Sequence, residues 1–291
     1  MRSSVRKAWK SPRAELFGEN LTPEEISYLC TSPTLKQLTI TRNSLPFQAI
    51  SSLTANKKLK TLCIGRSEID HWKARILSQN TTFQRVGLNG NDLCDSGTIA
   101  LSRNNTWSFL ELANNLIGDE GVEALAGNTT LTELILAENH AISDQGARDL
   151  SDNTTLAYLD LGKTGIGSLG ILALAFNPTL TSLLLPRNNL TDKDARILAR
   201  NITLIHMDLS GNTITNQGVM ALSRNMTLSR LRFHDTERHY QNHVIFSPPT
   251  NRYHDTLIHM EGIKESLDTF PADILRHILI PYLYFPSISI Y

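Results

Sequence analysis

Apolar residues recur along this chain in one fixed phrase, in which an apolar residue is followed by others three and five positions later, as in "LTELILAEN". The first apolar residue of the phrase, here called position 0, opens nine units spaced by 24 residues, apart from one spacing of 25. These residues are Leu35, Leu59, Phe83, Trp107, Leu131, Leu156, Leu180, Leu204 and Leu228. Alternation at +3 and +5 predicts a strand. A period this regular indicates a solenoid, because each unit can bury its apolar side only against its neighbours.

The second half of each unit has a helical period instead. In "GDEGVEALAGN", Gly121 and Leu125 are four residues apart, and the same pair recurs in four other units. Burying a large apolar side chain stabilises by about 1.5–3 kcal/mol, so several in each unit can offset the entropy that ordering it costs. The pattern therefore predicts strands alternating with helices around one continuous core.

The segments "LTELILAEN", "LTSLLLPRN" and "LIHMDLSGN" resemble the leucine-rich repeat family, whose pattern is LxxLxLxxN, and the resemblance covers residues 11–236. It implies an α/β solenoid shaped as a curved horseshoe, with a parallel β-sheet on the concave face and helices or turns on the convex face. The short Asn-Thr-Thr-Leu style is similar to repeat proteins that intracellular bacteria deliver into host cells, which implies an effector secreted into the host cell cytosol. The predicted parts are a basic tail (1–10), an N-terminal capping partial repeat (11–34), the solenoid of nine units with the last incomplete (35–236), a polar His-rich linker (237–256) and a C-terminal helical cap or F-box-like segment (257–291).

Two columns of asparagine follow the repeat. At +8 the chain must turn out of the strand, and a side-chain amide can satisfy backbone groups left without strand partners. In the family this column forms an asparagine ladder, and its members here are Asn43, Asn91, Asn115, Asn139, Asn188 and Asn212, with Ser67 and Thr164 as substitutes. A second column, as in Asn128, ends each helix, where we expect asparagine to adopt a left-handed backbone. Most of these asparagines read N-x-T, and we interpret those sequons as products of the repeat.

Composition narrows the function classes. The chain has 28 basic and 28 acidic side chains and a net charge of zero, which gives no reason to expect binding to nucleic acid. No apolar run is long enough to span a membrane. Three widely spaced cysteines, Cys30, Cys63 and Cys94, favour reduced thiols and a cytoplasmic location over a disulfide framework.

Catalytic and metal motifs are weak. The sequence has no phosphate loop, HExxH motif or nucleophile elbow, so we predict a non-enzymatic protein without a cofactor. Arg42 and Arg66 are candidates for a GTPase-activating arginine, although repeat turns explain both. His239 and His243 are spaced like a helical zinc pair, but Pro248 and Pro249 interrupt the region, and we predict no metal site.

Binding is the function that the pattern favours. Side chains at +2 and +4 of each strand point away from the core, onto the concave face. There, apolar residues on four successive strands are interleaved with charge, as in a protein-binding hot spot. The predicted partner-binding residues are Phe109, Glu111, Glu133, Ile135, Tyr158, Asp160, Leu184, His206 and Asp208. They imply a protein partner with a basic surface and apolar knobs.

The C-terminal segment "SLDTFPADILRHILIPYLYFP" carries an apolar stripe at helical spacing. It resembles the opening of an F-box, which implies contact with a Skp-type adaptor of a cullin-type ubiquitin ligase and a role as substrate receptor. The matching adaptor-binding candidates are Phe270, Pro271, Ile274, Leu275, Ile278 and Leu279. The chain departs from that pattern, with Phe270 for Leu and Asp273 for Glu, and ends where the remaining F-box helices should begin. The alternative is a helix that only covers the last repeat.

Overall fold

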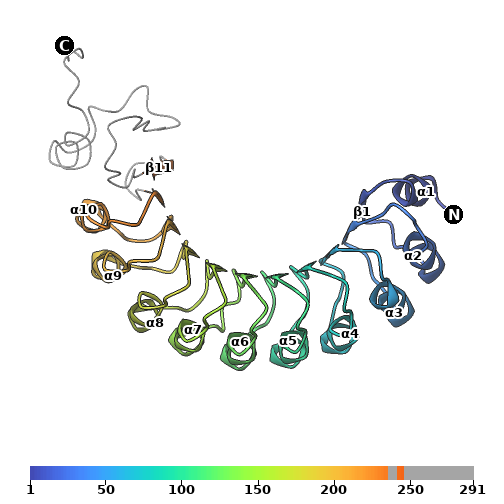
Figure 1. Cartoon of the computed structure of the whole chain (residues 1–291), viewed down its shortest axis with the longest axis horizontal. Coiled ribbons are helices and arrows are strands. Elements are labelled where there is room, and N and C mark those ends of the chain that lie inside the picture. The colour runs from blue at the N-terminus through green and yellow to red at the C-terminus, as the bar shows by residue number, and fades with distance from the viewer. Residues whose placement is uncertain (235–240, 246–291) are drawn as a thin grey trace, which may run out of the picture.

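The computed structural model describes residues 1–233 and the backbone of 234 and 241–245. Within these residues the chain forms one sheet of 11 strands in sequence order, β1 to β11, and the helices between them line its outer side (Figure 1). The strands are β1 (Arg13–Phe17), β2 (Gln37–Thr41), β3 (Thr61–Gly65), β4 (Arg85–Gly87), β5 (Phe109–Glu111), β6 (Glu133–Ile135), β7 (Tyr158–Asp160), β8 (Ser182–Leu184), β9 (His206–Asp208), β10 (Arg230–His234) and β11 (Gln241–Ile245). The helices are α1 (Ser3–Trp9), α2 (Pro23–Cys30), α3 (Phe47–Ala55), α4 (His71–Leu77), α5 (Asp95–Ser102), α6 (Asp119–Ala126), α7 (Asp144–Ser151), α8 (Ser168–Leu174), α9 (Asp192–Leu198) and α10 (Asn216–Leu222). This is the predicted α/β horseshoe.

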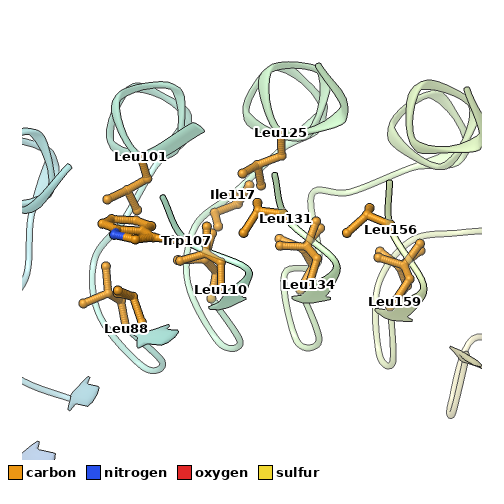
Figure 2. Packing of buried hydrophobic residues seen from close by; sticks show 14 of the residues in the cluster. Leu88, Leu101, Trp107, Leu110, Ile117, Leu125, Leu131, Leu134, Leu156 and Leu159 are labelled. Carbon is orange, nitrogen blue, oxygen red and sulfur yellow. The ribbon is translucent and has the colours of Figure 1, made fainter. Parts of the chain in front are cut away.

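The core lies between the sheet and the helices. Strand residues at +3, such as Leu110 and Leu134, are fully buried and pack beneath residues at position 0 such as Trp107 and Leu131 (Figure 2). Helix residues such as Leu125 cover them from the convex side. Because β1 to β10 are all parallel and pair position for position, every unit repeats the same stack of side chains.

The +8 asparagines form a ladder inside the coil. Asn139 is fully buried, and its amide nitrogen donates to the carbonyl oxygens of Leu112 (2.9 Å) and Leu136 (2.8 Å). Its side-chain oxygen accepts from the backbone N–H groups of Asn115 (3.1 Å) and Ile117 (3.2 Å). Each side chain therefore joins two units and satisfies backbone groups that the turn leaves without strand partners.

The second asparagine column does not adopt the left-handed backbone that we expected. Asn56 has φ −67° and ψ 134°, and the left-handed residues lie instead at +7, as in Arg66 (φ 49°) and Glu138 (φ 63°). The asparagine side chain makes the turn by hydrogen bonding. The Asn128 amide nitrogen donates to the Asn104 carbonyl oxygen (2.9 Å), and its oxygen accepts from the N–H of Leu131 (2.8 Å). The backbone can stay extended because these bonds already fix the turn.

A third ladder runs along the starts of the helices. Asp119, the first residue of α6, accepts hydrogen bonds from the N–H groups of Ser143 (2.8 Å) and Gly146 (3.0 Å) in the next unit. Asp95, Asp144 and Asp192 make the same pair of bonds to the helix that follows each of them. A Cβ on Gly146 would lie 2.7 Å from Asp119 Oδ1. The recurring helix glycine therefore makes room for the aspartate of the preceding unit.

Between α5 and α10 the aspartate ladder is interrupted at the junction of α8 and α9. Helix α8 begins with Ser168 where α5, α6, α7 and α9 have aspartate, and α9 carries Asp194 where α5 to α8 and α10 have glycine. Asp194 is only 2% exposed, and its Oδ2 accepts from the N–H of Thr191 (2.8 Å), so it caps its own helix. The smaller serine leaves the space that the Asp194 side chain fills.

Both ends differ from the prediction. Residues 1–10, expected to be a basic tail, contain α1, whose Val5 (0% exposed) and Ala8 (6% exposed) are buried against the first unit. Within the predicted linker 237–256, Gln241–Ile245 form β11, which pairs antiparallel with β10. The six adaptor-binding candidates and the rest of the C-terminal segment lie outside the described residues.

Candidate functional site

The concave face consists of two parallel rows of half-buried side chains, one from position +2 and one from +4 of each strand. In β5 to β9 the middle strand residue is buried and both flanking residues are half-buried, so the flanking residues face away from the core. All nine predicted partner-binding residues lie in these rows. Strand register gives the order Glu111, Ile135, Asp160, Leu184, Asp208 along the +4 row. Along the +2 row the order is Phe109, Glu133, Tyr158, Ser182, His206, in which Ser182 was not predicted.

Arg85 completes the first row, and the sequence analysis missed it. Its guanidinium carbon lies 3.8 Å from the centre of the Phe109 ring, and two nitrogens donate to the Glu133 carboxylate at 3.0 and 3.1 Å. The bidentate pair spans β4 to β6 and covers Phe109 on β5. Both charged side chains are about two-fifths exposed, which keeps the worth of the pair near the 0–1 kcal/mol of a surface ion pair. Phe109 is thus a covered anchor, whereas no cation in the described residues pairs with Glu111 or Asp160 within ion-pair distance.

The second row alternates acidic and apolar residues. Glu111, Asp160 and Asp208 are separated by Ile135 and Leu184, so each carboxylate is two strands, or about 10 Å, from the next. Burial, followed by repulsion from Asp160, raises the pKa of Glu111 above its ordinary value. Burial also raises the pKa of Asp160, and Asp208 adds to this, although the Gly162 N–H bound to Asp160 opposes it.

The same negative field reaches the first row. Burial, followed by repulsion from Asp160, Glu133 and Asp208, raises the pKa of the Tyr158 hydroxyl. At the C-terminal end of the rows, basic side chains offset the negative charge. Arg232 pairs with Asp208 at 3.6 Å, and burial together with Arg230 lowers the pKa of His206. Negative potential is therefore concentrated between β5 and β8, around the apolar side chains.

The other candidates do not converge on a site. Arg42 lies over the Phe17 ring at 5.2 Å, and a Cβ on Gly90 would meet Arg66 Cγ at 2.7 Å, so both arginines pack along the turns. His243 belongs to a strand, which removes the helical spacing that the zinc hypothesis needed. Among the described residues no cluster of three or more His, Cys, Asp or Glu side chains could hold a metal ion. No helix in that part of the chain is long and apolar enough to cross a membrane.

A comparison with protein families finds the same repeat. The family described as "Leucine Rich repeat" matches residues 104–126, 127–151, 152–175 and 200–223. No curated protein is significantly similar in sequence. Among solved structures, the chain is similar to an internalin (inlF) from Listeria monocytogenes, with 20% identity over 72% of this chain and 71% of that one and a TM-score of 0.49. It is also similar to a chain in the Rad7 and Elc1 complex of yeast, with 16% identity over 74% of each chain and a TM-score of 0.43.

The repeated strand-and-helix units and their ladders define a solenoid repeat protein that presents a broad face for binding. Residues 104–175 and 200–223 of the chain match leucine-rich repeats, and the other units have the same strand-and-helix form. Its architecture is that of a protein–protein interaction module.

Proposed function

We propose that this protein is a non-enzymatic binding module that captures a partner protein on its concave face, between β5 and β9. The observation that carries the proposal is the +4 row, in which Ile135 and Leu184 alternate with Glu111, Asp160 and Asp208. Of these carboxylates, Glu111 and Asp160 have no paired cation among the described residues, and together with the half-buried apolar side chains beside them they are poorly solvated in the free protein. A partner that brings lysine or arginine together with apolar side chains would improve the environment of both kinds of residue.

The raised carboxyl pKa values support a basic partner. A pKa that is raised by burial and by neighbouring acids means that the ionised form is disfavoured at that position, so a bound cation regains that free energy. Arg85 already forms an ion pair with Glu133 and covers the ring of Phe109. The partner's basic residues are therefore expected opposite Asp160 and Glu111, with an apolar side chain against Tyr158.

The experiment compares two double variants of the whole chain as baits in affinity capture from a host-cell lysate. Tyr158→Ser with Asp160→Asn removes the centre of the concave face, and Trp72→Ser with Glu123→Gln makes matched changes at exposed convex positions. We expect one partner to be retained by the wild type and by the convex variant, to be lost from the concave variant, and to be released by salt. Equal capture by both variants would remove the concave face from consideration.

The resemblance of the 24-residue repeat to bacterial proteins delivered into host cells supports a role as an effector in the host cytosol. The thiols of Cys30, Cys63 and Cys94 are all free in the structure, which is compatible with a reducing compartment. Delivery is tested by fusing the chain to a reporter enzyme that is active only in the host cytosol. Absence of host-dependent signal would argue against this location.

The second candidate is a substrate receptor that uses the concave face as reader and residues 270–279 as the contact for a Skp-type adaptor. The F-box-like residues Phe270, Pro271 and Ile274 favour it. Co-purification with the adaptor that is lost on deleting 268–291 would support this role, and no co-purification would dismiss it. Nothing in the packing of Arg42 or Arg66 favours GTPase activation.

A further inference from the structure

An exposed apolar patch lies along the edge of the solenoid where the strands begin. Phe176 is 70% exposed, Ile202 80%, Met226 67% and Ile205 41%. We call these four residues the edge patch. All four side chains are attached to the turns between a helix and the next strand, in the last units of the repeat.

Hydrogen bonds show that these turns are stacked on one another. Asn225 donates to the Asn201 carbonyl oxygen (2.5 Å), and Asn201 donates to the Ala175 carbonyl oxygen (2.9 Å). Ile202 and Met226 directly follow these asparagines, so they occupy equivalent places in adjacent turns. The Ser229 N–H bonds to the Ile205 carbonyl oxygen (2.9 Å), which places Ile205 beside the same turns.

The repeat itself does not require apolar residues here. The residue that follows the asparagine is polar in the first five of these turns, where it is Lys57, Thr81, Asn105, Thr129 and Thr154, and it is Pro178 in the next. Large apolar residues, Ile202 and Met226, stand at this position only in the last two turns. Since a stacked turn tolerates polar side chains equally well, the change indicates that something apolar covers this edge near the C-terminal end.

The route of the chain indicates what covers it. Strand β11 runs antiparallel to β10 and pairs Ile245 with Arg230, which is four residues after Met226. The chain is thus brought back to the edge where the strands begin, and residues 246–291 continue from that edge. Among them, Ile274, Leu275, Ile278 and Leu279 form the apolar stripe that the sequence places at helical spacing.

We infer that the C-terminal segment docks on the edge patch of its own chain through this stripe. The apolar stripe and the edge patch have similar lengths. Ile274 and Leu279 would be about 7.5 Å apart along a helix, and two steps between stacked turns span about 10 Å. A tether of the length between Ile245 and Ile274 supplies an effective concentration on the order of millimolar, so a weak contact suffices to keep the segment docked. The same stripe contains most of the adaptor-binding candidates, so docking and adaptor capture exclude each other.

The test is hydrogen exchange of residues 272–281 in the full-length protein. The variant Ile202→Asp with Met226→Asp disrupts the edge patch, and Leu169→Ser with Trp72→Ser changes two exposed apolar residues elsewhere. Because Ile202 and Met226 are 80% and 67% exposed, their replacement should leave the solenoid folded, which circular dichroism checks. We expect protection of 272–281 in the wild type to fall by about tenfold or more in the patch variant and to persist in the control.

A dilution series distinguishes docking of the C-terminal segment on its own chain from docking on a second copy. Docking within one chain predicts protection that is constant over about a 100-fold range of protein concentration, whereas protection by a second copy would weaken on dilution. Protection that is absent from the wild type, equal in the two variants or dependent on concentration would overturn the inference. The concave face takes no part in this measurement, so the outcome is independent of partner capture.

Discussion

The sharpest consequence of the fold concerns Asn139 in the +8 ladder, and the change that tests it is Asn139→Ala. Three backbone groups would lose the partner that the side chain now provides, namely the N–H groups of Asn115 and Ile117 and the carbonyl of Leu136. The Leu112 carbonyl would keep its bond from the Asn115 amide. A buried polar group without a partner costs about 1–3 kcal/mol, so at the lower end of that range the three groups together should lower the free energy of unfolding by about 3 kcal/mol.

Urea unfolding followed by circular dichroism measures this loss, and calorimetry should show a fall in Tm of roughly 6–12 °C. Asn105→Ala is the control, because Asn105 is exposed, and it should change stability by no more than about 0.5 kcal/mol. Asn139→Ser should lie between the two, since Ser67 in the same column donates to the Gly65 carbonyl (2.8 Å) and accepts from the Asn43 N–H (3.1 Å). If Asn139→Ala were no worse than Asn105→Ala, the ladder would not stabilise the coil.

Two further predictions concern the aspartate ladder and the concave face. Gly146→Ala should destabilise by about 1–3 kcal/mol although alanine favours helices, because its Cβ would lie 2.7 Å from Asp119 Oδ1. Gly127→Ala, where the nearest atom is 3.7 Å away, should be neutral or stabilising in the same urea titration, and equal losses would contradict the steric account. Since the folded-state pKa of Asp160 is raised, its ionisation opposes folding at neutral pH, and Asp160→Asn, which can still accept from Gly162, should raise the unfolding midpoint at pH 7. That gain should shrink as the pH falls toward the ordinary carboxyl value of 3.8, and a gain independent of pH would show that charge is not its cause.

The solenoid and the orientation of its strands could be predicted from the sequence because they depend on local periodicity. Once Leu110, Leu134 and Leu159 are assigned to the core, the two-residue period of a strand leaves Phe109, Glu133 and Tyr158 on the other side. No knowledge of distant contacts is needed for that step.

Features that depend on contacts between units were missed. Arg85 covers Phe109 and binds Glu133 two strands away, and neither contact can be inferred from the sequence of a single unit. The aspartate ladder did leave a signal, the recurring Asp-x-Gly at the start of successive helices, but only coordinates show that Asp119 bonds to the glycine of the next unit. The burial of Val5 was missed because the five basic residues between Arg2 and Arg13 dominate that stretch of sequence.

The exchange of Ser168 and Asp194 also makes the order of the units matter. Excising the unit that contains α8 would keep the 24-residue spacing and every core leucine in phase, yet it would place Asp194 opposite Asp144, at the position where Gly170 now lies. Two carboxylates would then compete for a space in which even a Cβ on Gly170 would lie 2.8 Å from Asp144 Oδ1. Each unit is thus matched to its neighbours, and removing the unit that contains α8 would require further substitutions where the two flanking units meet.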